Sequence, residues 1–269
     1  IVARIIQLTD MHVLPPSQWV SGVLNTYELL IDTIDTLLDD WHKIGPIDAV
    51  IVTGDITETG DVESYQLFRQ QVRRLPVPYF LIPGNHDRRD PLRQCFEDMA
   101  TIPKSGKINW VHDLADLRLI GLDTLIEGQG GGDLDDADLK FLAQAIAAAN
   151  TRPILLAMHH PPFASGMVFM DKIGLTDTGP LADILNAAPN EIRVICGHIH
   201  STIISNIGNT VAISAAATCS AFPTDYRIDA PVGFNKTPRG YSLHNWDQGF
   251  RTTCMTLVKS SGPNPFNAP

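Results

Sequence analysis

Short apolar runs of strand length alternate along the chain with longer stretches whose apolar residues recur at helical spacing. Runs that are apolar almost throughout indicate strands buried on both faces, as in sheets whose parallel strands are joined by helices. This alternation predicts an α/β fold. The predicted strands are residues 4–8, 49–52, 77–82, 117–122, 154–157 and 192–196. The predicted helices are the stretch between the Asn25 cap and Gly45, and residues 62–75, 92–99, 135–149 and 181–187.

Beyond His200 the pattern changes from alternating strands and helices to pairs of strands. A hairpin turning at Gly208-Asn209 and a later strand pair flank an irregular stretch that contains several prolines. The end of the chain is expected to be loose. The expected segments are a hairpin over 202–207 and 210–213, an irregular stretch over 215–238, strands over 240–246 and 250–257, and a tail over 262–269.

Aspartate, asparagine and histidine residues follow the carboxyl ends of most of the predicted strands. Because these ends gather at one edge of a sheet fed by crossover helices, residues far apart in the sequence can converge there. In Gly197-His198-Ile199-His200, two imidazoles at i and i+2 of an extended segment point the same way. The residues at these strand ends are Asp10, His12, Asp55, Asn85, His86, His159, His198 and His200.

Composition and charge narrow the class of partner. The 269 residues are 44% hydrophobic, which is ordinary for a globular protein, and no apolar run reaches the ~18 residues of a membrane span. The formal net charge of -10 argues against a long nucleic acid as partner, because phosphate backbones bind to Lys and Arg. A small anionic substrate is compatible with this charge if metal cations supply local positive charge.

The four cysteines match no metal-binding or redox pattern, because none of them falls in a CxxC spacing. Cys95, Cys196 and Cys254 lie among apolar neighbours and are expected to be buried free thiols. This favours a reducing cytoplasm. A disulfide between Cys219 and Cys254 is the alternative.

Seven of the strand-end residues form a set of oxygen and nitrogen ligands without a thiolate. Seven ligands exceed the four of a closed zinc site and suit two metal ions that share a bridging carboxylate. Two such ions can clamp the attacking and leaving oxygens of a phosphoryl displacement. The set is Asp10, His12, Asp55, Asn85, His159, His198 and His200.

Each motif also has a simpler explanation when it is taken alone. Gly54-Asp55 is typical of a turn or helix cap, Gly84-Asn85-His86-Asp87 of a polar turn, and His159-His160 before two prolines of a rigid loop. The accidental explanation requires all of these to coincide at strand ends. Six of the nine histidines fall in these segments, and the other three, His42, His112 and His244, are expected to be solvated or structural.

The order and spacing of these motifs resemble the calcineurin-like metallophosphoesterases over roughly residues 4–205. The finer resemblance is to class III cyclic nucleotide phosphodiesterases and the bacterial glycerophosphodiesterases near them. It implies a four-layer αββα sandwich of two mixed β-sheets flanked by helices, with a small C-terminal extension. The motifs are Asp10-x-His12, Gly54-Asp55, Gly84-Asn85-His86-Asp87, His159-His160 and Gly197-His198-x-His200.

The resemblance also implies a role for each residue. One metal would be bound by Asp10, His12 and His200, and the other by Asn85, His159 and His198, with Asp55 bridging. His86 would lie near the substrate phosphate and assist catalysis as a transition-state stabiliser or a proton donor to the leaving group. Asp87 would orient His86 or a ligand, and His160 would play only a supporting role.

The implied domains are a metallophosphoesterase core over 1–204, a cap or dimerisation extension over 205–245, and a return strand with a loose tail over 246–269. The extension would contact a second copy and wall the active site, which predicts a homodimer or higher oligomer. The loop with Trp19 and the loop 128–132 could border the entrance. Glu58, Thr124 and His244 are further candidate pocket residues.

The expected function is a binuclear metal-dependent phosphodiesterase that acts on small diesters such as cyclic nucleotides or glycerophosphodiesters. A metal-bound hydroxide would attack phosphorus, and the two ions could be Fe, Mn, Zn or Co. The lack of an evident Arg cluster favours a diester over a dianionic monoester. The alternatives are a phosphomonoesterase acting on nucleotides or proteins, a nuclease, and a non-catalytic metal-binding scaffold of the same fold.

Overall fold

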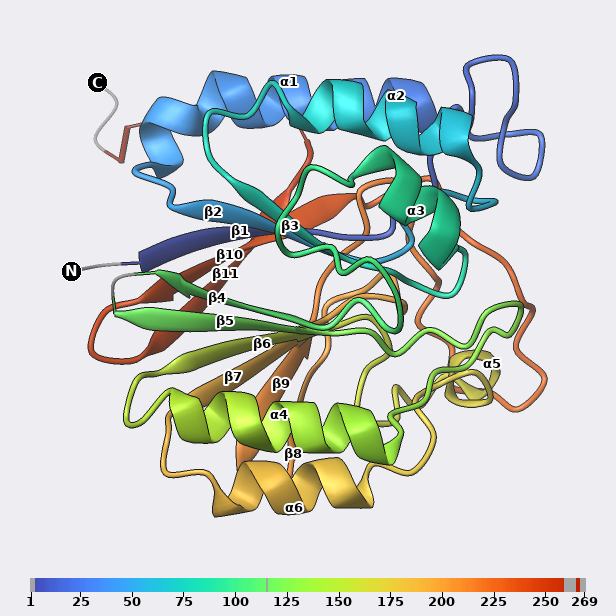
Figure 1. Ribbon diagram of the computed structural model, residues 1–269. Coiled ribbons are helices and arrows are strands. Elements are labelled where there is room, and N and C mark those ends of the chain that lie inside the picture. The colour runs from blue at the N-terminus through green and yellow to red at the C-terminus, as the bar shows by residue number, and fades with distance from the viewer. Residues whose placement is uncertain (1–2, 115, 259–264, 267–269) are drawn as a thin grey trace.

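Two mixed β-sheets lie face to face and are covered on their outer faces by helices, which gives four layers (Figure 1). The structure is a computed structural model, and it describes residues 3–114, 116–258 and 265–266. The expected αββα sandwich is therefore confirmed. Among the described residues, no helix has the length and apolar character needed to cross a membrane.

The first sheet consists of three neighbouring parallel strands, followed on one side by two strands that are each paired antiparallel with their neighbour. Strand β1 pairs in parallel with β2, which pairs in parallel with β3, while β10 runs antiparallel to β1. The sheet order is β11-β10-β1-β2-β3. The strands are β1 (Ala3–Leu8), β2 (Ala49–Thr53), β3 (Tyr79–Ile82), β10 (Gly240–Trp246) and β11 (Phe250–Thr256).

The second sheet also has a parallel centre, formed by β5, β6, β7 and β9. Antiparallel strands β4 and β8 close its two edges. The sheet order is β4-β5-β6-β7-β9-β8. The strands are β4 (Trp110–Leu114), β5 (Leu117–Leu122), β6 (Ile154–Met158), β7 (Ile192–Cys196), β8 (Ile204–Ile207) and β9 (Thr210–Ser214).

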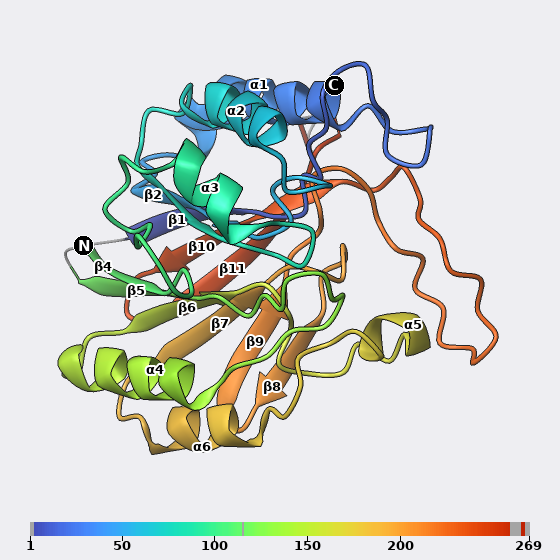
Figure 2. The ribbon, with the colours of Figure 1, turned by 45° about the vertical axis from the view of Figure 1, so that its right-hand side comes forward.

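Helices cover the outer face of each sheet because each carries one apolar stripe. Helices α1 and α2 lie over the first sheet, with α3 beside α2, while α4 and α6 lie over the second (Figure 1). The short α5 stands apart, next to the loops at the carboxyl ends of the strands (Figure 2). The helices are α1 (Thr26–Ile44), α2 (Val62–Val72), α3 (Arg89–Cys95), α4 (Asp136–Ala148), α5 (Val168–Asp171) and α6 (Gly179–Ala187).

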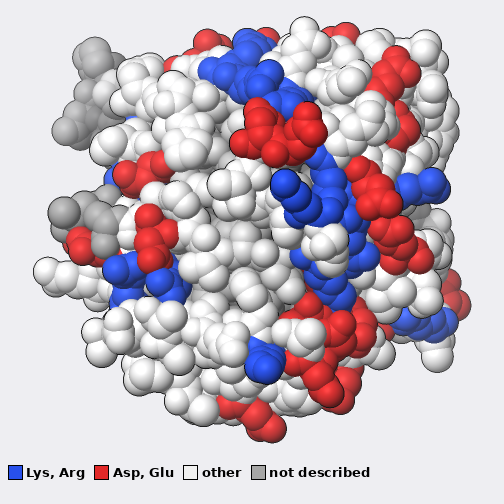
Figure 3. Space-filling view, viewed as in Figure 1, with Lys and Arg blue, Asp and Glu red and all other residues white. Residues whose placement is uncertain are grey.

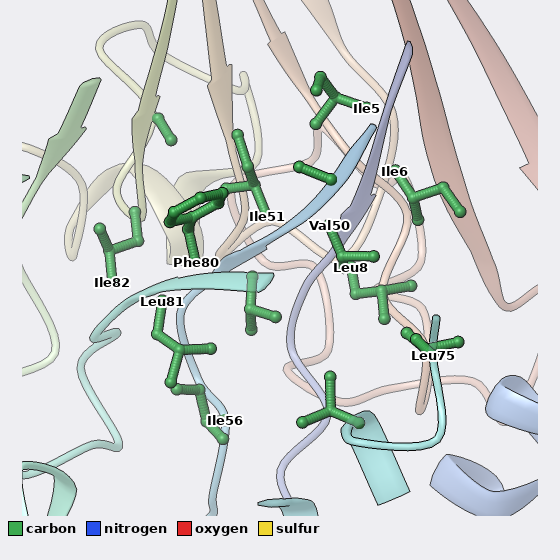
Figure 4. Close-up of a cluster of buried hydrophobic side chains, with 14 of the residues drawn as sticks. Ile5, Ile6, Leu8, Val50, Ile51, Ile56, Leu75, Phe80, Leu81 and Ile82 are labelled. Carbon is green, nitrogen blue, oxygen red and sulfur yellow. The ribbon is translucent and has the colours of Figure 1, made fainter. Parts of the chain in front are cut away.

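The core fills the space between the sheets and beneath the helices. Ile5, Ile51 and Phe80 come from neighbouring strands of the first sheet and belong to one buried cluster with Leu155 and Ile195 of the second (Figure 4). Burial of each such side chain is worth roughly 1.5–3 kcal/mol. A polar contact also crosses between the sheets, since the Gln7 amide donates to the carbonyl of Cys196 over 2.9 Å. The packing therefore fixes the strand ends of both sheets relative to each other.

The predicted elements are present with changed ends, and two elements were not predicted. Strand β3 starts at Tyr79 rather than at 77, next to Pro78, which has no N–H to donate. Helix α3 covers Arg89–Cys95 rather than 92–99, with Pro91 tolerated in its first turn. Edge strand β4 lacks a strict alternation, and α5 has only four residues, so neither produces a clear periodic pattern.

The segment 205–245 contributes strands to both sheets. Its β8 and β9 form one edge of the second sheet, and β10 lies beside β1 in the first. The connection over residues 215–239 runs outside the sheets and extends past α5 (Figure 2). Its role as a cap or dimer contact stays a prediction. The predicted loose tail 262–269 lies, apart from residues 265 and 266, outside the described residues.

Two expectations about cysteine differ in outcome. All four cysteines are free in the structure, so Cys219 and Cys254 are not joined. Cys254 is exposed rather than buried, because β11 is the outer edge strand of its sheet. Cys95, Cys196 and Cys219 are buried.

Candidate metal centre

The loops at the carboxyl ends of five strands bring the seven predicted ligand residues into one cluster. These ends lie on one side of the molecule, the right-hand side in Figure 1, where both sheets end. Asp10 and His12 follow β1, Asp55 follows β2, Asn85 follows β3, His159 follows β6, and His198 and His200 follow β7. All except the partly exposed Asn85 are buried.

Asp10, His12 and His200 form one half of the cluster. Nε2 of His12 lies 3.2 Å from Nε2 of His200, and Nε2 of His200 lies 3.4 Å from Oδ1 of Asp10. Both oxygens of Asp10 also accept from the backbone N–H of His198 over 3.1 Å, which fixes the carboxylate against the loop after β7. Three electron-pair donors from the two sheets therefore converge.

Asn85, His159 and His198 form the other half. Oδ1 of Asn85 lies 3.0 Å from Nε2 of His159 and 2.9 Å from Nδ1 of His198. The side chains come from β3 in the first sheet and from β6 and β7 in the second, so this half also exists only where the two sheets meet.

Asp55 lies between the two halves. Its Oδ2 is 3.5 Å from Nε2 of His12 and 3.3 Å from Nε2 of His159. Its Oδ1 accepts from the backbone N–H of His86 over 2.9 Å, which holds the carboxylate in place from the other side. One oxygen of Asp55 thus faces both groups of ligands.

The four imidazoles are held by their outer nitrogens, which leaves their inner nitrogens facing the cluster. A carbonyl oxygen only accepts, so Nδ1–H of His159 donates to Thr53 over 2.7 Å and Nε2–H of His198 donates to Ile173 over 2.9 Å. Nδ1 of His12 lies 2.6 Å from a Glu58 oxygen, and Nδ1 of His200 lies 3.0 Å from the Ser220 hydroxyl. Metal-binding histidines are typically oriented by outer partners of this kind.

This arrangement fits metal cations. With His159 and His198 in the tautomers set by their outer partners, two nitrogen lone pairs point at the carbonyl oxygen of Asn85. Lone pairs that face each other at such distances repel unless a proton or a cation lies among them. The hard-to-intermediate oxygen and nitrogen set suits Fe, Mn, Zn or Co. One ligand atom from each of Asp10, Asp55 and His159 lies within 4.8 Å of the other two, which is close enough to share an ion.

The electrostatics of the cluster also call for positive charge. Burial disfavours the charged form of His12, but the Glu58 hydrogen bond and the nearby carboxylates outweigh it and raise the pKa to about 9. For His159, Asp55 likewise outweighs burial and raises the pKa to about 9. Although burial opposes it, the pKa of Asp55 is held well below its ordinary value, chiefly by His159. Metal cations would supply this positive charge and release the imidazole protons.

Five of the seven residues adopt the left-handed backbone conformation that non-glycine residues rarely use. Their φ values are 53° for Asp10, 48° for His12, 48° for Asp55, 70° for His198 and 53° for His200. Such backbone strain persists where surrounding contacts over-determine it, and it concentrates at functional sites.

His86 lies at the edge of the cluster and Asp87 beneath it. The His86 side chain is 37% exposed, and its Nδ1–H donates to the Glu58 carbonyl over 3.0 Å. Asp87 is buried and accepts from the backbone N–H groups of Ile56 and Gly84 over 3.1 and 2.8 Å. It therefore braces the turns after β2 and β3, the turns that carry Asp55 and Asn85. Its role in orienting His86 or a ligand stays a prediction.

His160 packs beside the rings of His159 and His198, and its own nitrogens bind Thr124 and the glycine-containing loop. Its Nε2–H donates to the Gly130 carbonyl over 3.1 Å, so its Nδ1 accepts from the Thr124 hydroxyl over 2.8 Å. Gly132 is packed against the ring, since a Cβ there would lie 2.2 Å from Nδ1 of His160. Thr124 thus supports His160 through a hydrogen bond. The loop 128–132 is tied to the centre through the bond between Gly130 and His160.

Glu58 and His244, the other candidate pocket residues, differ in whether they line the cavity over the cluster. Glu58 lines the cavity over the cluster, as expected. His244 does not, because it is buried in β10, where its Nε2 lies 2.9 Å from Oε1 of Gln7 and its Nδ1 2.9 Å from the Thr252 hydroxyl. Of the two roles expected for His244, pocket residue and structural residue, the structure therefore supports the structural one. His42 is exposed and His112 half-buried.

Several groups that shape the centre were missed by sequence reasoning. The carbonyls of Thr53 and Ile173 and the hydroxyl of Ser220 hold three of the imidazoles. A backbone carbonyl has no residue-type signature, so no sequence signal could have identified the first two. Ser220 lies in the irregular stretch after β9, where periodicity gives no information.

The chain resembles known proteins in sequence and in structure. The family model described as calcineurin-like phosphoesterase matches residues 3–202. A probable glycerophosphodiester phosphodiesterase GpdQ of Arcobacter nitrofigilis is 31% identical over 265 residues, 97% of this chain and 96% of the relative. The 3',5'-cyclic adenosine monophosphate phosphodiesterase CpdA of Pseudomonas aeruginosa is 28% identical over 84% of this chain and 80% of the relative.

Solved structures share the fold at low sequence identity. A dimetal phosphatase from Danio rerio superposes with a TM-score of 0.68 at 11% identity, covering 96% of this chain and 97% of the other. A purple acid phosphatase from yellow lupin superposes with a TM-score of 0.67 at 14% identity, covering 95% of this chain and 52% of the other.

Proposed function

Because the chain belongs to the calcineurin-like phosphoesterase family, we propose that it is a metal-dependent phosphodiesterase that hydrolyses small phosphodiesters. The observation that carries the proposal is the pair of ligand groups on either side of Asp55, whose Oδ2 faces His12 at 3.5 Å and His159 at 3.3 Å. The names of the relatives support the same reaction, since they are phosphodiesterases of glycerophosphodiesters and of cyclic AMP.

Asp10, His12 and His200 would hold one metal ion, and Asn85, His159 and His198 the other, with Asp55 shared. When bound, the two ions supply Lewis-acid stabilisation of phosphoryl charge and lower the pKa of an attacking water. The chain itself orients the ligands, because each imidazole is held by an outer partner.

His86 acts on the leaving group. Its Nδ1–H is held by the Glu58 carbonyl over 3.0 Å, so the proton that it would donate is the second proton of the imidazolium form, on Nε2. The ring lies edge-on to His12 with 4.6 Å between centroids, so it stands beside the centre and lines the same cavity. A proton delivered from Nε2 neutralises the alkoxide that forms as the P–O bond breaks.

The surroundings of the centre favour a small diester. The cavity that opens on the cluster has a volume of about 210 Å³, and none of the described residues that line it is Arg or Lys, while Arg88 lines the neighbouring cavity beside His86. A dianionic monoester would call for more positive charge than a monoanionic diester. The net charge of -10 opposes a nuclease role, and on the face shown in Figure 3 basic side chains lie beside acidic ones.

The remaining expectations are part of the same proposal. The metals are two ions from Fe, Mn, Zn and Co, the protein works in the cytoplasm, and residues 205–245 support a homodimer or higher oligomer. The connection over 215–239 carries exposed apolar side chains, including Tyr226, Ile228 and Val232, which suits a contact with a second copy.

Turnover of matched substrates tests the function. The purified protein, with its metals measured, should hydrolyse bis(p-nitrophenyl) phosphate faster than p-nitrophenyl phosphate, and a chelator should abolish both reactions. Faster hydrolysis of the monoester would point to a phosphomonoesterase instead. Full metal occupancy without turnover of any ester would identify a scaffold. A screen over cyclic nucleotides, glycerophosphodiesters and single-stranded DNA would then define the substrate.

A further inference from the structure

We infer that the preferred substrate is an asymmetric phosphodiester with one apolar or aromatic ester arm and one small polar arm. The apolar arm occupies a cavity walled by Phe222 and Phe234, which are specificity-determining residues. This inference rests on the proposed function and deepens it, because it names the chemical class of the two groups on phosphorus.

Hydrocarbon side chains form one wall of the cavity of about 210 Å³ that opens on the ligand cluster. We call this cavity the apolar lobe. Its wall comes from three segments far apart in the sequence: the loop before α1, helix α5, and the connection after β9. The hydrocarbon side chains that matter here are Val20, Leu24, Phe169, Met170, Phe222 and Phe234.

The aromatic part of this wall is fixed against the ligand cluster. Phe222 stacks on the His200 ring with 4.3 Å between centroids and 25° between planes. Phe169 meets Phe222 edge to face at 6.4 Å and is 42% exposed, so it stands at the rim. An aromatic group entering from solvent would therefore pass Phe169 and meet ring faces and edges beside the centre.

A second cavity, of about 440 Å³, borders the other side of His86 and is different in character. We call it the polar lobe. It is lined by Glu58, Thr59, Arg88, Gln129 and the backbone of Gly128 and Gly130, together with Asn85, His86 and Asp87. Among the described residues, no Leu, Ile, Val or Phe lines it, so an apolar group would gain little from binding there.

The two lobes share Glu58, Asn85 and His86, so they meet at the ligand cluster. A phosphodiester bound there must send its two ester arms away from phosphorus in different directions. One arm then meets hydrocarbon and the other meets hydrogen-bonding groups. A cavity on the order of 150 Å³ is enough for a benzene ring, so the apolar lobe can accept an aromatic arm.

Competitive inhibition separates the arms without depending on which one leaves. Diphenyl phosphate and dimethyl phosphate carry the same charge and differ only in their arms. With bis(p-nitrophenyl) phosphate as the reporter substrate, we expect the inhibition constant of diphenyl phosphate to be at least about tenfold lower than that of dimethyl phosphate, because the lobe buries apolar surface. The ratio of the inhibition constant of dimethyl phosphate to that of diphenyl phosphate should fall by about fivefold or more in Phe234→Ala, since part of the wall is removed.

Matched variants show whether a change in the ratio comes from the apolar lobe rather than from loss of metal or of the fold. Ile204→Ala removes an exposed apolar side chain of β8, which lines neither lobe, and should leave the ratio unchanged. Phe222→Leu keeps an apolar side chain but loses the aromatic face, and it should lower the ratio less than Phe234→Ala does. Metal content and melting temperature of every variant show whether the centre and the fold are intact.

The outcomes distinguish this inference from the function on which it rests. A ratio near one in the unmodified protein, or a ratio that Phe234→Ala and Phe222→Leu leave unchanged, would overturn the apolar lobe while hydrolysis of the reporter still supports the phosphodiesterase. If the metal-loaded protein hydrolyses no diester, the proposed function fails. Binding of diphenyl and dimethyl phosphate would then be compared by calorimetry, with the same expected ratio.

Discussion

Nε2 of His12 lies 3.2 Å from Nε2 of His200, although 188 positions separate the two residues in the chain. Their outer nitrogens are taken by Glu58 and Ser220, so neither ring can turn its inner nitrogen away without losing a hydrogen bond. Two inward nitrogens at this distance need a positive centre near them, which a proton or a metal ion can supply. Because the positions of His12 and His200 and the positive charge between them depend on each other, loss of either residue should affect both metal binding and the local fold.

Substitution of Asp55, the carboxylate predicted to be shared by two metal ions, should remove metal. In Asp55→Ala the oxygen that faces both His12 and His159 is lost, so at least one metal per chain should be absent and turnover should fall to background. Elemental analysis of the purified variant measures the metal content. Asp90→Ala, at an exposed carboxylate paired with Arg93, is the control and should keep both metals.

Substitution of His86 should slow the reaction without removing metal. In His86→Ala the proton donor is lost while the predicted ligands stay, so kcat should fall by ~10²–10⁴-fold with unchanged metal content. Steady-state kinetics on bis(p-nitrophenyl) phosphate measure this. His42→Ala, at an exposed histidine of α1, should have no effect. Normal kinetics in His86→Ala would remove this residue from the mechanism.

Glu58 should act through the imidazoles of His12 and His86. Its carboxylate lies 2.6 Å from Nδ1 of His12, so Glu58→Ala should lower metal affinity by about 10–100-fold, as loss of such outer partners does elsewhere. Glu58→Gln keeps an acceptor oxygen and should fall between Glu58→Ala and the unmodified protein. Metal titration monitored by calorimetry distinguishes them. Equal affinity in Glu58→Ala and the control Glu63→Gln, on the exposed face of α2, would contradict this role.

The metal-free protein should lose stability as pH rises. The pKa values of His12 and His159 are raised from 6.5 to about 9, because hydrogen bonds and the nearby carboxylates outweigh burial. Their contribution to the free energy of unfolding is complete below about pH 6.5 and is lost as pH rises through about 9. The melting temperature of chelator-treated protein should therefore fall by several degrees over this range.

The metal-loaded protein should show much less of this fall, because its ligands have already released their protons. A melting temperature of the metal-free protein that stays constant or rises toward pH 9 would contradict the assignment. The opposite sign is expected for Asp113, whose pKa is lowered to about 2 chiefly by its hydrogen bond with Arg118. Its small, largely solvent-screened contribution is lost in acid.

A methyl group at Gly84 should displace Asp55, the predicted bridging residue. A Cβ there would lie 2.2 Å from Oδ1 of Asp55, so Gly84→Ala should destabilise the fold by ~1–3 kcal/mol and reduce metal content. Gly233→Ala, where a Cβ would meet nothing within 4 Å, is the matched control. Denaturant unfolding and elemental analysis measure the two effects. Full metal content in Gly84→Ala would show that the Asp55 position is adjustable.

The sequence by itself determined the order of strands and helices and the residues that end the strands. Buried parallel strands are nearly continuous apolar runs, and the chain must place polar chemistry where such runs stop. The pattern of strand ends therefore singles out Asp55, His198 and His200 from the sequence. The short-range physics of hydrophobic periodicity and turns is enough for this, because it depends only on neighbours along the chain.

Only the tertiary structure decided which strand ends meet and what surrounds them. His198 faces Asn85 and His200 faces His12, a division that the spacing of the two histidines alone left open. The carbonyls that fix the tautomers, the role of Asp87 beneath two turns, and the hydrocarbon wall of Phe222 and Phe234 all depend on contacts between segments far apart in the chain. Such contacts arise from packing the two sheets together, and no local pattern encodes which side chains that packing brings within bonding distance.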